Sequence, residues 1–185
     1  MPSHRGSSHL PIRLPGSWRI PSAPDPDPEE GFLSDPTPRE PSGPVDPIPA
    51  GYHTVTPYLI VEDGDALIRF AQAAFDATVV ERSNTPDGRL MHADLKVGDS
   101  HIMLGEATEE WGPTRSLLHL YVPDVDAVFA QALKAGARSV RDPETMFYGD
   151  RTGGVEDPSG TQWWIATRVE IVSPEEMARR QAEGG

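Results

Sequence analysis

The sequence contains no cysteine among its 185 residues. This excludes a disulfide framework and thiolate chemistry. No run approaches the roughly 18 apolar residues that cross a bilayer, and no apolar signal-peptide stretch follows the N-terminus. Basic residues are also few, since 16 Lys and Arg stand against 29 Asp and Glu, for a formal net charge of −13. Because nucleic-acid binding needs a basic footprint, we expect a cytoplasmic protein that binds neither nucleic acid nor membrane.

Proline is unevenly distributed, with 13 of the 20 prolines in the first 50 residues. That segment has few large apolar residues, and runs such as PSAPDPDPEE cannot bury enough surface to offset the entropy of ordering the chain. We therefore expect residues 1–50 to form a disordered, proline-rich extension. The alternatives are a docking arm for a partner and a translation start further downstream. The rest of the chain is long enough for one compact domain.

An internal repeat organises that domain. YLIVEDGDALIRFAQAAFDATVV, from Tyr58, aligns with HLYVPDVDAVFAQALKAGARSVR, from His119, at a shift of 61 residues. In each copy an aspartate, Asp63 or Asp124, precedes a stretch whose apolar residues recur at helical spacing. Both aspartates are predicted N-caps, and Gly136 predicts the end of the second helix.

Three strands are predicted after each helix. In the first copy they span 78–82, 89–97 and 101–105, and in the second copy 138–142, 151–156 and 162–167, separated by turns such as TPDG, VGDS and DPSG. Each copy is therefore a β-α-β-β-β module. A last short helix is predicted from Ser173, where Ser-Pro-Glu-Glu is a capping box with proline in the first turn.

The motifs TPYLIVEDGDALIRF, RLMHADLKVGDSHIML, LHLYVPDVDAV and FYGDRTGGVEDPSGTQWWIAT resemble the vicinal oxygen chelate superfamily of glyoxalase I, bleomycin-resistance proteins and extradiol dioxygenases. Within it, the PhnB-like subgroup is the most similar. The resemblance implies an α+β fold in which tandem βαβββ modules form curved mixed sheets around a cavity. We expect this domain over residues 51–172, with modules at about 54–105 and 115–168, followed by a helix and tail over 173–185.

Catalytic members of the superfamily hold one divalent metal through a side chain from each of four strands. The resemblance places three of these ligand positions at Thr56, Leu117 and Trp164. Threonine is a poor ligand, and leucine and tryptophan are not ligands. We therefore expect no glyoxalase-type metal site and no cofactor.

Side chains alternate along a strand, so the residues that share a face with these positions are candidates for a ligand cavity. On the strand at 90–97 we expect Leu90, His92, Asp94 and Lys96 toward the cavity and the intervening residues in the core, with His101 at the surface. Arg151 either pairs with Asp150 or clamps a substrate carboxylate or phosphate. The candidate ligand-binding residues are Tyr58, His92, Asp94, His119, Tyr121, Arg151, Gln162 and Trp164.

This aromatic lining with a few polar groups predicts a small-molecule binder of the sequestration, resistance or sensing type, and a homodimer. The alternative is a metal-dependent isomerase, lyase or dioxygenase with a rearranged site at His92, Asp94 and His119. A third hypothesis is a protein that mainly associates with partners through its proline-rich arm. The sequence leaves open whether any reaction is catalysed.

Overall fold

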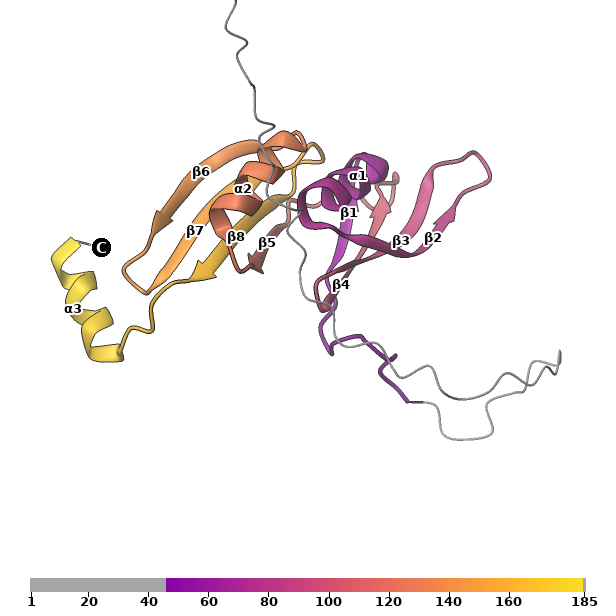
Figure 1. The fold of residues 1–185 in the computed structure, drawn as a ribbon. Coiled ribbons are helices and arrows are strands. Elements are labelled where there is room, and N and C mark those ends of the chain that lie inside the picture. The colour runs from indigo at the N-terminus through magenta and orange to yellow at the C-terminus, as the bar shows by residue number, and fades with distance from the viewer. Residues whose placement is uncertain (1–45, 185) are drawn as a thin grey trace, which may run out of the picture.

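The computed structural model describes residues 46–184. Residues 1–45, on which most of the predicted disordered extension falls, lie outside the described residues. The described chain forms eight strands and three helices arranged as two modules (Figure 1). They are β1 (Tyr58–Val61), α1 (Gly64–Phe75), β2 (Thr78–Asn84), β3 (Leu90–Val97), β4 (Ser100–Glu106), β5 (Leu117–Tyr121), α2 (Val125–Lys134), β6 (Arg138–Thr145), β7 (Asp150–Glu156), β8 (Gln162–Arg168) and α3 (Pro174–Gly184).

Each module contains one four-stranded mixed sheet. Sheet 1 has the order β1-β4-β3-β2 and sheet 2 the order β5-β8-β7-β6. The first strand of each sheet runs parallel to its neighbour, and the other pairs are antiparallel. Tyr58 pairs with Met103, and His119 pairs with Trp164. The second pair lies 61 residues after the first, so the repeat and the tandem βαβββ fold are confirmed down to the strand register.

The two module helices begin where the sequence predicts. Asp63 accepts a hydrogen bond from the Ala66 amide at 2.8 Å, and Asp124 accepts one from the Ala127 amide at 3.0 Å. These bonds satisfy amides that have no partner within a helix. Gly136, with a φ of +104°, follows the end of α2. Both predicted N-caps and the predicted stop are therefore confirmed.

The core lies between the sheets and their helices, and it continues across the two modules. Trp163 of β8 packs against Phe75 of α1, with the ring centroids 4.6 Å apart. Gln131 of α2 donates a hydrogen bond to the Ala73 carbonyl at 2.9 Å. The modules of one chain thus join through their helix-bearing sides. The opposite side of each sheet, which bears no helix, is called its open face below.

The start of β3 departs from strict alternation. Leu90 is buried beneath the first turn of α1, where a Cβ on Gly64 would overlap its side chain, whereas Met91 is 56% exposed. The prediction that Leu90 faces the cavity and Met91 the core is therefore wrong. The cause is the register shift between Ser83 and Asn84 on the neighbouring strand, which resets the facing of β3 at this end.

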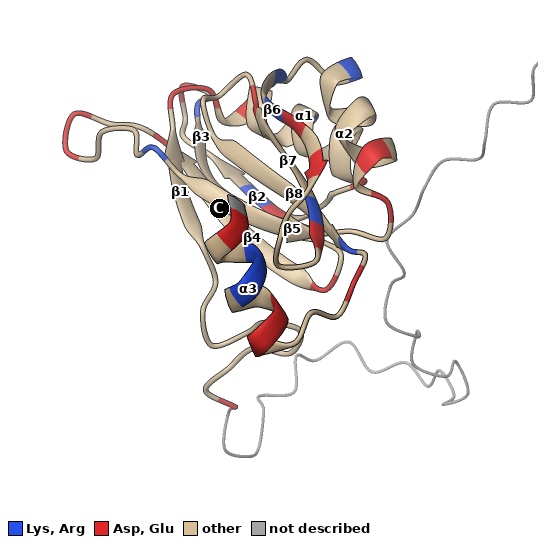
Figure 2. Cartoon of the chain, turned by 90° about the vertical axis from the view of Figure 1, so that its left-hand side faces the viewer, with Lys and Arg blue, Asp and Glu red and all other residues tan. Residues whose placement is uncertain are grey.

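Helix α3 lies at the outer edge of the second module and carries both acidic and basic side chains (Figures 1 and 2). Ser173 accepts a hydrogen bond from the Glu176 amide, which confirms the predicted capping box start. Arg180 binds Glu170 at 2.7 Å and so attaches the helix to the segment that follows β8. No helix among residues 46–184 is both long and apolar enough to cross a membrane.

Candidate functional site

The adjacent tryptophans of β8 lie on opposite faces of sheet 2. Trp163 is buried in the core, and its indole Nε1 donates to Asp157 Oδ2 at 2.9 Å. Trp164 lies on the open face, with its ring across Gly154, where an added Cβ would meet the indole at 3.3 Å. The Nε1 of Trp164 is buried and has no hydrogen-bond acceptor among the described residues. A buried donor without an acceptor is unfavourable, which makes this indole unusual.

Three further side chains stand on the open face of sheet 2 because they alternate along β5. Leu117 and Tyr121 are 60% and 58% exposed, and His119 lies between them with its ring 4.8 Å from that of Tyr121. The Tyr121 hydroxyl donates to Asp150 Oδ2 at 2.7 Å, and this hydrogen bond to a carboxylate raises the pKa of Tyr121. Gln162, at the start of β8, lies on the same face beside a hollow of about 750 Å³.

The open face of sheet 1 has a similar composition. Tyr58 is 48% exposed and its hydroxyl lies beside Gly105. It is 3.3 Å from Nδ1 of His92, and the two rings are stacked at 5.7 Å. Each open face thus presents a tyrosine, a histidine and a glycine, although these residues do not occupy equivalent positions of the repeat, since Tyr58 aligns with His119 and Gly105 with Ala166.

A third group on sheet 1 centres on Asp94. This carboxylate is only 1% exposed, and its oxygens lie 2.9 and 3.1 Å from Nδ1 of His101. The hydroxyl of Tyr52 also donates to it, while the Tyr52 ring stacks on the His101 ring at 4.0 Å. His101 is therefore buried, and the prediction that it lies at the surface is wrong. Its position two residues from Met103 on β4 places it on the open face by simple alternation.

Tyr52 belongs to a segment that no sequence pattern connects with the site. Residues 46–57, called the strap below, precede β1 and cross the open face of sheet 1 beside Met103. A hollow of about 370 Å³ lies between the strap and the sheet. The strap lies before the repeated modules, so the repeat gave no signal for it.

Arg151 does not join the open-face residues. It lies on the helix-bearing side of sheet 2, where it forms two hydrogen bonds with Asp126 at 2.6 and 2.7 Å. This bidentate contact lowers the pKa of the Asp126 carboxyl. Asp150 instead binds Tyr121 and, at 3.7 Å, Arg168. The expected pairing of Arg151 with Asp150 is therefore wrong, because alternation turns these two side chains to opposite faces. That Arg151 clamps a substrate carboxylate or phosphate stays a prediction.

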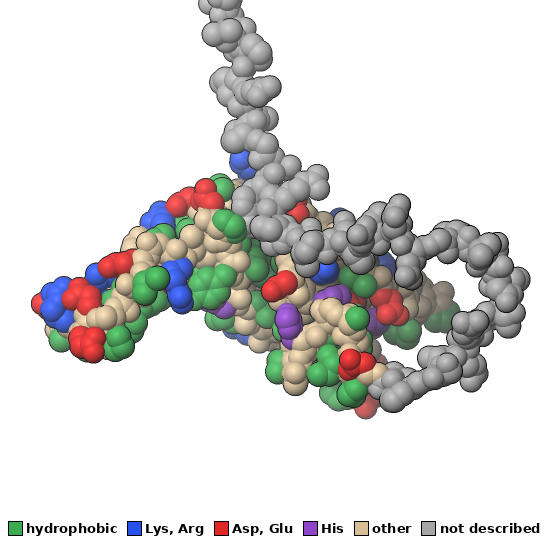
Figure 3. Space-filling view, turned by 60° about the horizontal axis from the view of Figure 1, so that its bottom comes forward, with side chains coloured by type: hydrophobic (Ala, Val, Ile, Leu, Met, Phe, Trp, Pro, Cys, Tyr) green, Lys and Arg blue, Asp and Glu red, His purple; other side chains and the backbone are tan. Residues whose placement is uncertain are grey.

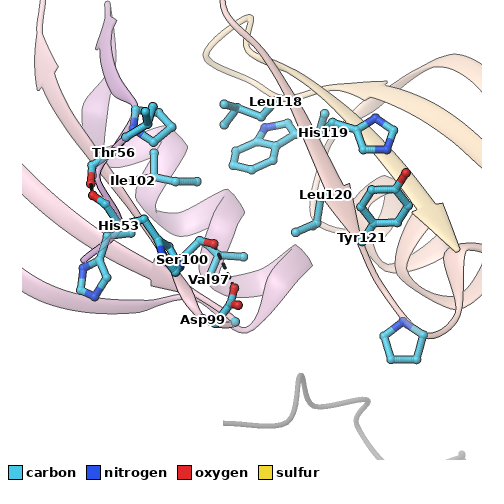
Figure 4. A pocket seen from close by; sticks show the side chains of 16 residues that line it. His53, Thr56, Val97, Asp99, Ser100, Ile102, Leu118, His119, Leu120 and Tyr121 are labelled. Atoms are coloured by element: carbon cyan, nitrogen blue, oxygen red, sulfur yellow. Dashed lines mark hydrogen bonds between the residues drawn. The ribbon is translucent and has the colours of Figure 1, made fainter. Parts of the chain in front are cut away.

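The structure does not bring His92, Asp94 and His119 together within one chain. Asp94 is held by Tyr52 and His101, and His119 belongs to the other module. Figure 4 shows Leu118 and Leu120 pointing toward the first module, whereas His119 and Tyr121 point away from it. Within residues 46–184, no group of three His, Asp or Glu side chains is arranged to hold a metal ion.

The positions that correspond to the superfamily's metal ligands do not fit a metal either. The Thr56 hydroxyl donates to the His53 carbonyl at 3.2 Å, Leu117 is apolar, and the indole of Trp164 carries a donor rather than a lone pair. The donor set needed for a glyoxalase-type metal is therefore missing at these three positions.

A separate cleft of about 640 Å³ lies between the modules (Figure 4). It is lined largely by apolar side chains from the helix-bearing sides of both sheets, among them Val97, Ile102, Leu118, Leu120 and Trp163. These residues continue the hydrophobic core toward the surface. We therefore interpret this cleft as the edge of the junction between the two modules. The candidate functional site consists of the two open faces.

Comparison with known families agrees with this architecture. The family model described as Glyoxalase/Bleomycin resistance protein/Dioxygenase superfamily matches residues 51–165. Uncharacterized proteins of Mycobacterium bovis and Mycobacterium tuberculosis (strain H37Rv) are each 35% identical over 142 residues. The alignments cover 71% of this chain and 93% and 84% of those proteins, respectively.

Solved structures share the fold. TioX from Micromonospora sp. ML1 is 25% identical with a TM-score of 0.55, over 61% of this chain and 96% of that chain. A putative 3-demethylubiquinone-9 3-methyltransferase, a PhnB protein from Bacillus cereus, is 17% identical with a TM-score of 0.52, over 62% and 99%. The predicted fold and the resemblance to this superfamily, with a PhnB protein among its structural neighbours, are confirmed.

Proposed function

The chain belongs to the Glyoxalase/Bleomycin resistance protein/Dioxygenase superfamily, and on that premise we propose that it is a cytoplasmic homodimer that binds a small organic molecule between aromatic open faces, without the usual glyoxalase metal ligands. Its function is then sequestration, resistance or sensing. The observation that carries the proposal is the exposure of Tyr58, Leu117 and Tyr121 on the two open faces.

Tyr58 on sheet 1, and Leu117 and Tyr121 on sheet 2, are left uncovered by the rest of residues 46–184. Figure 3 shows, for one face of the molecule, that histidine and hydrophobic side chains occur among charged and polar ones. Adjacent exposed aromatic and aliphatic groups are typical of a binding surface rather than of an inert one. The hollows beside Thr56 and Met103 and beside Leu117 and Gln162 give each open face a concave part.

The partner that fits these faces is a second copy of the chain. Within one chain the modules meet through their helix-bearing sides, so the two open faces do not pack against each other. A two-fold axis would place sheet 1 of one copy opposite sheet 2 of the other, and would do so twice. Each of the two cavities would then combine Tyr58 and His92 from one copy with the Trp164 side of the other.

The lining favours a planar ligand with at least one hydrogen-bond acceptor. Tyr58, Tyr121 and Trp164 offer ring faces, and such pockets bind flat apolar bodies through a few directional polar groups. The indole Nε1 of Trp164 has no acceptor among the described residues, so a ligand oxygen or nitrogen reached by a small ring movement would relieve an unmet donor. His92, His119 and Gln162 supply further polar contacts at the rim.

The test is a binding screen that compares the two adjacent tryptophans. The wild-type chain is screened by thermal shift against aromatic acids, amides and heterocycles, and each hit is titrated by calorimetry. Trp164→Phe should weaken a hit at least tenfold, whereas Trp163→Phe, a matched change on the buried face, should leave its affinity within about threefold. A hit that responds equally to both changes, or no hit at all, would contradict the proposal.

A further inference from the structure

The strap is held to sheet 1 by very few side chains. Between residues 46 and 56, only Tyr52 and Thr56 are even partly buried, and all the others are exposed. Thr56 bonds only within the strap, to the His53 carbonyl. The segment before Thr56 therefore depends on one side chain, Tyr52, for its position over the sheet. A covering segment that is held by one side chain can be displaced by any molecule that competes for the contacts of that side chain. For Tyr52 these contacts are with Asp94 and His101, and they are called the Tyr52 site below.

The Tyr52 site resembles a binding site for a small aromatic molecule. The phenol ring of Tyr52 lies on the imidazole of His101, with centroids 4.0 Å apart and the planes 26° from parallel. Its hydroxyl donates to Asp94, a carboxylate that is 1% exposed and whose other contacts come from Nδ1 of His101. The His101 ring favours a ligand with a flat aromatic ring, and the buried Asp94 carboxylate favours a ligand with a hydroxyl donor.

The backbone beside the Tyr52 site is shaped for close approach. Gly51 has a φ of +85°, a conformation that glycine adopts without steric cost, and an added Cβ there would lie 3.7 Å from Nε2 of His101. The strap therefore turns close to Nε2 of the imidazole, and the Tyr52 ring stacks on the imidazole ring. In this arrangement the chain covers Asp94 and His101 from solvent.

We propose that the Asp94–His101 pair is a binding site for a phenol, which the chain fills in cis with its own Tyr52 and which a phenolic ligand takes over when the strap is displaced. This inference rests on the proposed function, because it assigns a ligand class to one half of the same open-face site. The hydroxyl donates to Asp94 and the ring stacks on His101. An aromatic ether lacks the donor, and an aromatic carboxylate would bring a negative charge against Asp94.

Competition from a tethered Tyr52 makes a quantitative prediction. In the closed state Tyr52 occupies the site, and in the open state the site is free. The apparent affinity of an external ligand is lowered by a factor close to the ratio of the closed to the open population. Removing the Tyr52 side chain should therefore unmask the site. Because Asp94 and His101 are unchanged in the Tyr52→Ala variant, its affinity for a phenol should depend on Asp94 and on the hydroxyl group of the ligand.

The experiment uses 4-methylphenol, which reproduces the tyrosine side chain, and 4-methylanisole as its control without a hydroxyl donor. Binding is followed through the ring resonances of His101 in the NMR spectrum of the full chain. Tyr52→Ala should bind 4-methylphenol at least tenfold more tightly than the wild type does, and at least tenfold more tightly than it binds 4-methylanisole. Adding Asp94→Asn to Tyr52→Ala replaces the charged acceptor with a weaker neutral one and should reduce this preference for the phenol.

Two outcomes would overturn the proposal: equal affinity of wild type and Tyr52→Ala for 4-methylphenol, or no binding by a folded Tyr52→Ala chain. If the Asp94→Asn chain does not fold, His101→Leu in the same background replaces it, and it should weaken 4-methylphenol binding by the loss of the His101 ring. Failure here leaves the Trp164-dependent screen intact. A failed screen with phenol binding in Tyr52→Ala would instead remove the Trp164-dependent ligand of sheet 2 and leave a small-molecule site on sheet 1.

Discussion

Two adjacent tryptophans should lose very different amounts of stability on the same truncation. Trp163 is buried against Phe75 and Phe70 and holds its indole N–H on Asp157, so Trp163→Ala leaves a cavity at the junction of the two modules. Truncation of a buried tryptophan to alanine costs about 3–5 kcal/mol. For a chain of this length, where 1 kcal/mol shifts Tm by roughly 2–4 °C, the expected loss is on the order of 6–20 °C.

Trp164→Ala should cost far less. Its ring is half-buried on the open face, and its truncation also removes an indole N–H that has no acceptor in the described part of the chain, so a loss of about 1 kcal/mol is expected. The free energy of unfolding is measured for both variants by urea denaturation followed by circular dichroism, at one protein concentration so that association contributes equally. The reasoning is refuted if Trp163→Ala lies within about 1 kcal/mol of wild type, or if Trp164→Ala is as damaging.

Other changes test single contacts. Gly64→Ala places a methyl group where Leu90 lies, so urea denaturation should show a loss of about 1–3 kcal/mol; an unchanged midpoint would contradict that packing. Asp150→Asn should lower the pKa of Tyr121, because the raised pKa comes from that carboxylate; the stability it represents is present below pH 10 and is lost as the pH rises through the folded-state value. Absorbance of tyrosinate against pH measures this, and an unshifted titration would refute it. Gly154→Val should displace the Trp164 indole, which lies on this glycine, and weaken the binding of any ligand at the proposed site at least tenfold. The free energy of unfolding should change far less than the free energy of binding.

The repeat explains why so much of the fold was accessible from the sequence. Asp63 and Asp124 mark equivalent helix starts, and the 61-residue shift carries the pair Tyr58–Met103 onto His119–Trp164. Local signals of this kind, caps and period-two alternation, are dictated by backbone geometry. They also placed the aromatic residues of the candidate site on one face of each sheet.

What the sequence did not reveal depends on contacts between distant segments. Nothing local to Tyr52 indicates that it reaches Asp94, 42 residues away. Arg151 has acidic neighbours at several positions, and only the three-dimensional fold selects Asp126 on α2. The facing of Leu90 likewise depends on an irregular pairing with β2, which alternation within β3 alone cannot predict.

The central claim, a ligand cavity shared between two copies, is tested most directly by complementation. Tyr58→Ala removes a ring from sheet 1 and Trp164→Ala removes one from sheet 2, so each variant alone has two damaged cavities per dimer. After the two variants are mixed and allowed to exchange subunits, each mixed dimer holds one intact cavity, and random pairing should restore about a quarter of the wild-type binding capacity. Recovery near that value is the predicted result. No recovery, with subunit exchange verified by mass spectrometry, would contradict the shared cavity and place the binding site within one chain.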